Sequence, residues 1–242
     1  MKLYDQVIAG TLAAIPADKT RRFAYDPKSC WKDHGSSEFL MQRDAALELG
    51  SEGEPSVNYT CVTSSGLIEE SGIWVVGEPL TRVKQPTAFA RIILLETSDL
   101  GEETDTEKAF QAIRNLEFVR YHVFPEGYMV RVSAQSNQEQ VRIGKGAVKA
   151  GISFERVGAL YIRKYLEIPE VKAVRAIFVT DRAVVEQVQA NAGTVDSITK
   201  TLTHILDGLP TDCGHCSLKP VCDEVEGMRE LHFGKKKPSE TK

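Results

Sequence analysis

Three cysteines lie close together near the end of the 242-residue chain: Cys213, Cys216 and Cys222. Two thiolates separated by two residues can point at one centre after a single tight turn, and a third five residues further on can close around it. Thiolates are the ligands that zinc and iron–sulfur clusters prefer. This density, in a chain that is otherwise poor in cysteine, predicts a metal or cluster site rather than three inert buried thiols.

The residues alone leave the fourth ligand and the metal open. His232 is the nearest candidate, since the chain between it and Cys222 can turn back, and His215 between the first two thiolates is its competitor. Oxygen ligands suit a soft centre less well; the nearby ones are Asp212, Asp223 and Glu224. Three cysteines and one histidine suit tetrahedral zinc, whereas three thiolates with one variable ligand suit a [4Fe–4S] cluster. The spacing is unlike the paired short knuckles of a zinc finger, which favours iron–sulfur.

Composition bounds the class of protein. With 42% hydrophobic and 26% charged residues the chain can bury a core, so it is not predicted to be disordered. A net charge of −4 argues against nucleic-acid binding. The longest apolar runs are far shorter than the ~20 residues that a membrane span requires, and the N-terminus lacks the pattern of a secretory signal. Five cysteines, three of them clustered, do not form a disulfide framework, so we expect a reduced, cytoplasmic protein.

The elements that must position this site are helices and strands in alternation. Helical apolar spacing predicts helices at 2–15, 39–49 and 105–117, two between 138 and 167, and two more at 182–191 and 194–207. Runs rich in β-branched and aromatic residues predict strands at 57–63, 73–76, 91–95, 127–133 and 172–180. Residues 17–35 are expected to be irregular. The fold class is therefore α/β, a mixed sheet with helices packed on it, followed by a small metal-binding segment.

Several other side chains are candidates for a functional role. Cys30 beside His34 could be a reactive thiol, whereas Cys61 is typical of a strand core and His122 and His204 of structural positions. The Gly144-Lys145-Gly146 string does not match a phosphate-binding loop and favours the start of a helix. A basic region on adjacent helices is expected to be a solvated face, with a CoA phosphate or an acidic redox partner as the alternative: Arg142, Lys145, Lys149, Arg156, Arg163 and Lys164.

The middle of the chain resembles acetyl-CoA synthase, the β subunit of the acetyl-CoA decarbonylase/synthase complex, in the domain that precedes its A-cluster. The similar segments, in order, are FPEGY (124–128), VRIGKGAVKAG (141–151), VGAL (157–160), VRAIFVTD (174–181) and TVD (194–196). The resemblance covers about residues 72–232 and leads into the cysteines. The first 70 residues are not part of the resemblance.

This resemblance implies that Cys213, Cys216 and Cys222 match three of the four cysteines that hold the [4Fe–4S] part of the A-cluster. His232 falls at the place of the fourth, which is the reason for preferring it to His215. The spacing before Cys222 is shorter than in that family. The Cys-Gly-Cys motif that holds the distal nickel there belongs to a following domain that this sequence does not contain, so full acetyl-CoA synthase activity is not expected from this chain alone.

The leading expectation is a cytoplasmic iron–sulfur protein of anaerobic or microaerobic metabolism. It would be an electron-transfer or accessory subunit with a protein partner. The resemblance adds acyl-CoA or one-carbon chemistry, with a CoA thioester nearby. The alternatives are a non-redox subunit with a structural zinc site, and a catalytic subunit that completes a nickel or corrinoid site with another chain. The expected organisation is an α/β domain over 1–208, in which about 1–70 form an unaligned extension, a cluster-binding segment over 209–234 and a flexible basic tail over 235–242.

Overall fold

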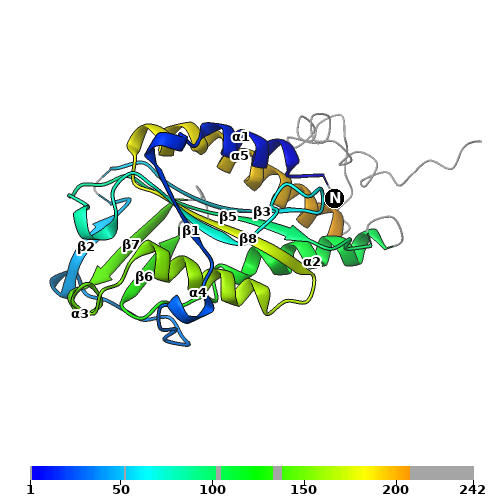
Figure 1. The fold of residues 1–242 in the computed structure, drawn as a ribbon. Helices are drawn as coiled ribbons and strands as arrows, with labels where there is room; N and C mark the ends of the chain where they lie inside the picture. The colour runs from blue at the N-terminus through cyan, green and yellow to red at the C-terminus, as the bar shows by residue number, and fades with distance from the viewer. Residues whose placement is uncertain (1, 52, 102–104, 133–137, 208–242) are drawn as a thin grey trace, which may run out of the picture.

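A five-stranded mixed sheet forms the centre of the molecule (Figure 1). The computed structural model describes residues 2–51, 53–101, 105–132 and 138–207. The strands, in their spatial order, are β1 (Thr20–Ala24), β4 (Gly72–Val76), β8 (Val171–Val179), β5 (Phe89–Thr97) and β3 (Ser56–Thr63). β4 runs parallel to β8, and β3 runs parallel to β5, whereas β5 is antiparallel to β8 and β1 to β4. Every residue of β3 and β5 is buried, as expected of strands covered on both faces.

Helices cover both faces of this sheet. Helices α1 (Asp5–Ala14) and α5 (Arg182–Leu206) pack against each other on one face, and α4 (Phe154–Leu166) lies on the other (Figure 1). Gly158 allows α4 to approach closely, because a Cβ atom there would lie 2.8 Å from the side chain of Ile73 on β4. The stacked rings of Phe89, Phe154 and Phe178 join α4 to two central strands.

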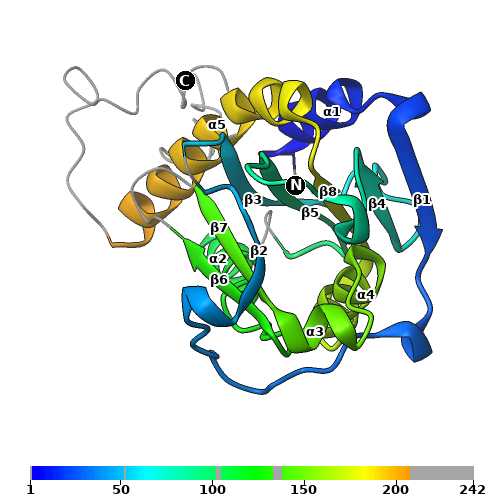
Figure 2. The ribbon, with the colours of Figure 1, turned by 90° about the vertical axis from the view of Figure 1, so that its left-hand side faces the viewer.

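A smaller antiparallel sheet contacts β3 and β5 through its middle strand. Its order is β2 (Ala45–Leu49), β7 (Glu139–Gly144) and β6 (Tyr128–Val132) (Figure 2). The short helix α3 (Lys145–Lys149) continues directly from β7. Helix α2 (Thr106–Val119) follows β5 and contacts both β3 and α5. The remaining single-turn helices are η1 (Ala17–Lys19), η2 (Pro27–Ser29), η3 (Gln42–Asp44) and η4 (Leu80–Arg82).

The predicted fold class is confirmed, and the differences concern individual elements. Residues 39–49, predicted as a helix, contain β2, because pairing with β7 overrides the helix preference of its alanines and leucines. The start of the predicted helical region 138–167 is the strand β7, which completes the small sheet. The segment expected to be irregular contains β1. The two predicted C-terminal helices form one continuous helix, α5, which runs through Gly193 without a break.

No helix among the described residues is both long enough and apolar enough to cross a membrane.

Candidate functional site

The predicted ligands Cys213, Cys216, Cys222 and His232, together with the alternative His215, lie outside the described residues. Within residues 2–207 as described, no group of three His, Cys, Asp or Glu side chains is placed to share a metal ion. The structure does describe the last helix before these cysteines in the sequence. That helix is α5, which ends at Leu206.

A buried network fixes the C-terminal half of α5 to the body of the domain. The Glu117 carboxylate on α2 accepts hydrogen bonds from the Tyr4 hydroxyl at 2.6 Å and from the Thr199 hydroxyl at 2.9 Å. Burial raises the pKa of Glu117, and these hydrogen bonds and the charge of Arg120 only partly oppose the effect. Three elements therefore meet at one carboxyl group: the start of α1, the last turn of α2 and α5.

Neither Cys30 nor Cys61 has a thiol whose pKa is lowered, as a reactive thiol would require. Cys30 is half-buried, and burial raises the pKa of its thiol. The imidazole of His34 is engaged elsewhere, since its Nδ1 lies 3.0 Å from the carbonyl oxygen of Ser36. Cys61 is fully buried in β3 with a pKa well above its usual value because of burial, so the prediction that it is a core residue is confirmed. The structure gives no support for a reactive thiol at Cys30.

Much of the basic region takes part in contacts within the chain. Arg142 pairs with Glu48 across the β2–β7 ladder at 2.5 Å, and Lys164 pairs with Asp33 at 3.0 Å. The Arg156 guanidinium lies 4.4 Å from the centre of the Trp31 ring. The predicted solvated face is therefore partly a set of structural contacts.

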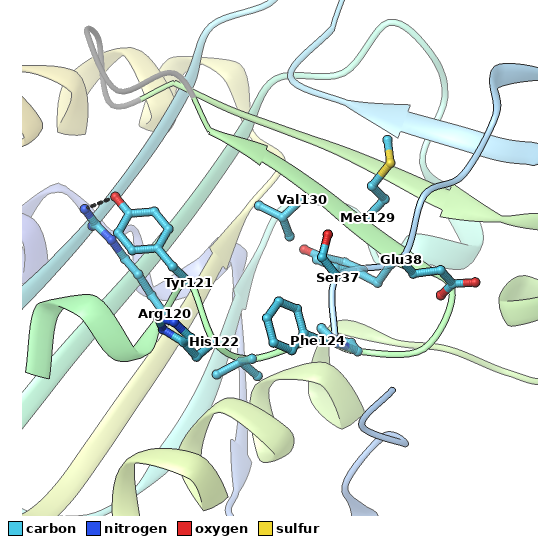
Figure 3. Close-up of a pocket in the computed structure, with 11 residues that line it drawn as sticks. Ser37, Glu38, Arg120, Tyr121, His122, Phe124, Met129 and Val130 are labelled. Carbon is cyan, nitrogen blue, oxygen red and sulfur yellow. Dashed lines mark hydrogen bonds between the residues drawn. The ribbon is translucent and has the colours of Figure 1, made fainter. Parts of the chain in front are cut away.

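A cavity of about 480 Å³ lies at the C-terminal end of α2, where sequence reasoning placed no site (Figure 3). Its lining comes from the C-cap residue of α2 and the connection that follows, from β6, and from a short segment that crosses them. The lining residues are Ser37, Glu38, Arg120, Tyr121, His122, Val123, Phe124, Pro125, Tyr128, Met129 and Val130. This size is typical of a small-molecule pocket, and we refer to it as the α2 pocket.

Arg120 and Tyr121 form one side of the α2 pocket. The guanidinium Nη2 donates to the Tyr121 hydroxyl at 2.8 Å and lies over the tyrosine ring, 4.8 Å from its centre (Figure 3). Arg120 is the C-cap residue of α2, where the negative end of the helix dipole favours a cation. Its Nε and Nη1 atoms are buried, and the described residues offer them no acceptor.

His122 and Phe124 form the adjoining wall. The His122 Nδ1 lies 3.2 Å from the Phe118 carbonyl oxygen, and its ring packs 4.5 Å from the Phe118 ring. The Phe124 ring lies 6.5 Å from the His122 ring in an edge arrangement. Sequence reasoning treated His122 as structural, and these contacts support that interpretation while also placing the side chain at the cavity.

The opposite wall begins with Tyr128, the first residue of β6, which Gly127 directly precedes. Gly127 has φ of +69°, and a Cβ atom there would lie 2.6 Å from Ala147, so only glycine fits. Its amide donates to the Glu38 carboxylate at 2.7 Å, which fixes the crossing segment. Tyr128 is 3% exposed, and its hydroxyl has no hydrogen-bond partner among the described residues.

Behind Tyr128 lies a buried ion pair that joins the two sheets. Arg91 on β5 and Glu139 on β7 form two hydrogen bonds, and the Arg91 guanidinium lies 4.6 Å from the centre of the Tyr161 ring. Burial and the charge of Glu139 both raise the pKa of Tyr128. Sequence reasoning missed this pair, although an arginine beside Ile92 and Ile93 in an apolar strand is the kind of signal that indicates a buried partner.

A second cavity, of about 880 Å³, lies where α5 begins. Arg182 lines it and is paired with Glu54 and Glu186, both at 2.9 Å. The Thr180 hydroxyl donates to the carbonyl oxygens of Val76 and Glu78. These charged and polar groups at the helix terminus are thus satisfied within the chain, unlike those of the α2 pocket.

Comparison with known proteins identifies the domain. No curated protein matches the chain. The model of one family, described as the CO dehydrogenase/acetyl-CoA synthase complex beta subunit, matches residues 35–185, which is more than half of the 242 residues. The match starts upstream of the resemblance seen in the sequence, contains β2 to β8 and the whole α2 pocket, and ends in the first turn of α5. The chain therefore belongs to the family of the CO dehydrogenase/acetyl-CoA synthase complex beta subunit.

Proposed function

We propose that this chain binds one [4Fe–4S] cluster through Cys213, Cys216, Cys222 and His232. It acts as an electron-transfer or accessory subunit in acyl-CoA or one-carbon metabolism, in the cytoplasm of an anaerobic cell. The observation that carries the proposal is the position of the cysteines. They follow, in the same chain, a domain that belongs to a family of CO dehydrogenase/acetyl-CoA synthase subunits.

The chemistry of the donor set fits such a cluster. Three thiolates and one imidazole supply four ligands of the softness that iron–sulfur centres require, and a bound cluster would supply one-electron transfer. A histidine in place of a fourth thiolate raises the reduction potential, by analogy with Rieske-type sites.

The described residues would provide a rigid attachment for the cluster segment. α5 is a continuous helix whose buried side chains pack on β3, and Thr199 ties it to Glu117. Cys213 follows the end of this helix closely in the sequence. The family description names a subunit of a complex, which supports a protein partner.

Metal analysis of protein prepared without oxygen tests the proposal. We expect a brown protein with about four irons and matching acid-labile sulfide per chain. Cys213→Ser and Cys222→Ser should each lose most of the iron. Cys30→Ser is the matched control, because that thiol is a half-buried group of the described body, and it should retain the iron.

Two outcomes would overturn the proposal. A colourless protein with one zinc per chain, lost in Cys213→Ser, would show a structural site in place of the cluster. Stoichiometric nickel or cobalt, with turnover that depends on a co-purifying subunit, would show a catalytic role in place of electron transfer.

A further inference from the structure

Strand β1 leaves one edge of the central sheet without a neighbouring strand. It is the last strand in the order of the sheet, and within the described residues it pairs with β4 alone. The Gly77 amide donates to the Lys19 carbonyl oxygen, which fixes the alternation of this ladder. By this alternation the backbone N–H and C=O groups of Arg22 and Ala24 point away from β4, and the described residues supply no partner for them. Figure 2 shows β1 at the outer margin of the molecule, so this edge is a template for a further strand.

Two arginines make this edge positively charged. Arg21 donates to a backbone carbonyl oxygen at 2.9 Å, and the exposed Arg22 lies over the ring of Trp74, 4.5 Å from its centre. Lys19, which directly precedes the strand, is paired with Asp181 at 2.8 Å. In contrast, neither arginine is paired with a carboxylate in the part of the chain that the structure describes. Both positive charges can therefore attract a carboxylate from another molecule.

A third cation lies on the same face of the sheet as Arg22. Arg175 on β8 is two residues from the strand partner of Trp74, and its guanidinium lies 4.4 Å from the centre of the Trp74 ring. Burial lowers the pKa of Arg175, and the nearby positive charge of Arg22 adds to this effect. The charges of Glu70 and Glu69 oppose it. The two guanidiniums on one indole ring repel each other, so a further carboxylate beside Arg22 would be attracted.

The side chains of β1 determine the kind of strand that fits beside it. Charged side chains on an edge strand hinder pairing with strands of like charge, and a second copy of this chain would bring the same arginines to the shared edge. An acidic strand is attracted instead, because opposite charges on facing strands stabilise the pair. Phe23 lies on the other face from Arg22 and is partly buried against the core, so it favours an apolar neighbour. The strand that fits therefore alternates acidic and apolar residues.

We propose that β1 binds an extended acidic segment of a partner protein, which adds to the central sheet as a sixth strand. The backbone of this segment bonds to the outward groups of Arg22 and Ala24, its carboxylates face Arg22, and its apolar side chains face Phe23. The family description names a subunit of a complex, which supports a protein partner. The inference rests on the protein partner of the proposed function but on none of the cluster ligands, so a negative metal analysis would leave it intact.

Calorimetric titration of the full chain at low salt tests this surface with two synthetic peptides. The acetylated and amidated peptide TEVEVET should bind saturably, and its counterpart TKVKVKT should bind at least about tenfold more weakly, because the facing charges then repel. Amide hydrogen exchange at Arg22 and Ala24 should slow when TEVEVET binds. Absence of saturable binding, equal binding of the two peptides, or slow exchange of both amides without any peptide would refute the proposal.

Two variants separate the contribution of charge from that of strand addition. Arg22→Glu reverses the charge and should lower the preference for TEVEVET over TKVKVKT at least about fivefold. Lys149→Glu makes the same change of charge at an exposed site on α3 and should leave the preference unchanged. Ala24→Pro keeps the arginines and removes an outward N–H group, which an edge strand tolerates, so it should weaken the binding of TEVEVET at least about tenfold.

The same variants define the results that would overturn the proposal. Unchanged binding of TEVEVET by Ala24→Pro would show attraction to the surface without an added strand. An unchanged preference in Arg22→Glu would show that the charge of the edge does not select its partner. Dimerisation of the free chain that Ala24→Pro abolishes would show that a second copy, and not an acidic partner, occupies this edge.

Discussion

Arg91 on β5 and Glu139 on β7 form a bidentate ion pair that solvent does not reach. Nε lies 2.8 Å from one carboxylate oxygen and Nη2 lies 2.5 Å from the other, and the two side chains are 1% and 0% exposed. The pair connects the five-stranded sheet to the small antiparallel sheet that carries part of the α2 pocket. The amide of Glu139 also donates to the Ser56 hydroxyl at 3.2 Å, which fixes the start of β7. Each charged group therefore depends on the other to offset the free-energy cost of its burial.

Replacing one partner of this pair should destabilise the protein strongly. Glu139→Leu leaves the Arg91 guanidinium buried and uncompensated, so we expect the free energy of unfolding to fall by about 3–5 kcal/mol. The double variant Arg91→Met/Glu139→Leu removes both charges and should recover most of this loss. Urea unfolding at neutral pH measures both values. A loss below about 1 kcal/mol in the single variant would show that the pair is hydrated in solution.

Glu117 should make stability fall as the pH rises. Burial raises its pKa above the ordinary value of 4.5, so the folded state holds this proton more tightly than the unfolded state does. The resulting stabilisation is complete below pH 4.5 and is lost as the pH rises through the raised folded-state pKa. Glu117→Gln keeps a neutral acceptor for Tyr4 and Thr199 and should flatten this dependence.

Urea unfolding measures the free energy of unfolding of Glu117→Gln and of the wild type from about pH 4 to about pH 8. The free energy difference between them should shift in favour of the variant as the pH rises. Glu107→Gln, on the first turn of the same helix, is the control for general charge effects. A difference that does not change with pH would mean that Glu117 is ionised with an ordinary pKa in the folded protein.

Gly158 should tolerate a methyl group poorly. A new Cβ atom at this position would lie 2.8 Å from Ile73 and 3.1 Å from Phe178, so Gly158→Ala forces α4 away from the sheet. Overpacking of this kind typically destabilises by about 1–3 kcal/mol. Gly193→Ala in α5 meets no atom within 4 Å and should stabilise by about 0.5–1 kcal/mol through helix propensity. Thermal unfolding of both variants tests the contrast, and equal effects would contradict the close packing of α4.

The sequence predicts four of the five strands of the central sheet, because these strands are apolar and β-branched, and it misses the edge strand β1. β3, β5 and β8 coincide with the runs at 57–63, 91–95 and 172–180. β2 and β7 are not predicted as strands, because their residues have no strong strand preference and their structure depends on mutual pairing, with Glu48 opposite Arg142. Only tertiary structure defines the α2 pocket, because Ser37 and Glu38 complete a lining that otherwise lies within residues 120–130. The cluster ligands stay a prediction from sequence.

His232 is the ligand whose replacement should change the proposed cluster in a distinctive way. A fourth thiolate is more electron-donating than an imidazole, so His232→Cys should retain the iron and lower the midpoint potential. His232→Ala should lower the iron content or shift the potential. Anaerobic redox titration with iron analysis measures both effects, and His215→Ala is the matched control, which should change neither. The reverse result, a shift in His215→Ala with His232→Ala unchanged, would assign the fourth position to His215, because only the residue that donates to the cluster can alter its electron density directly.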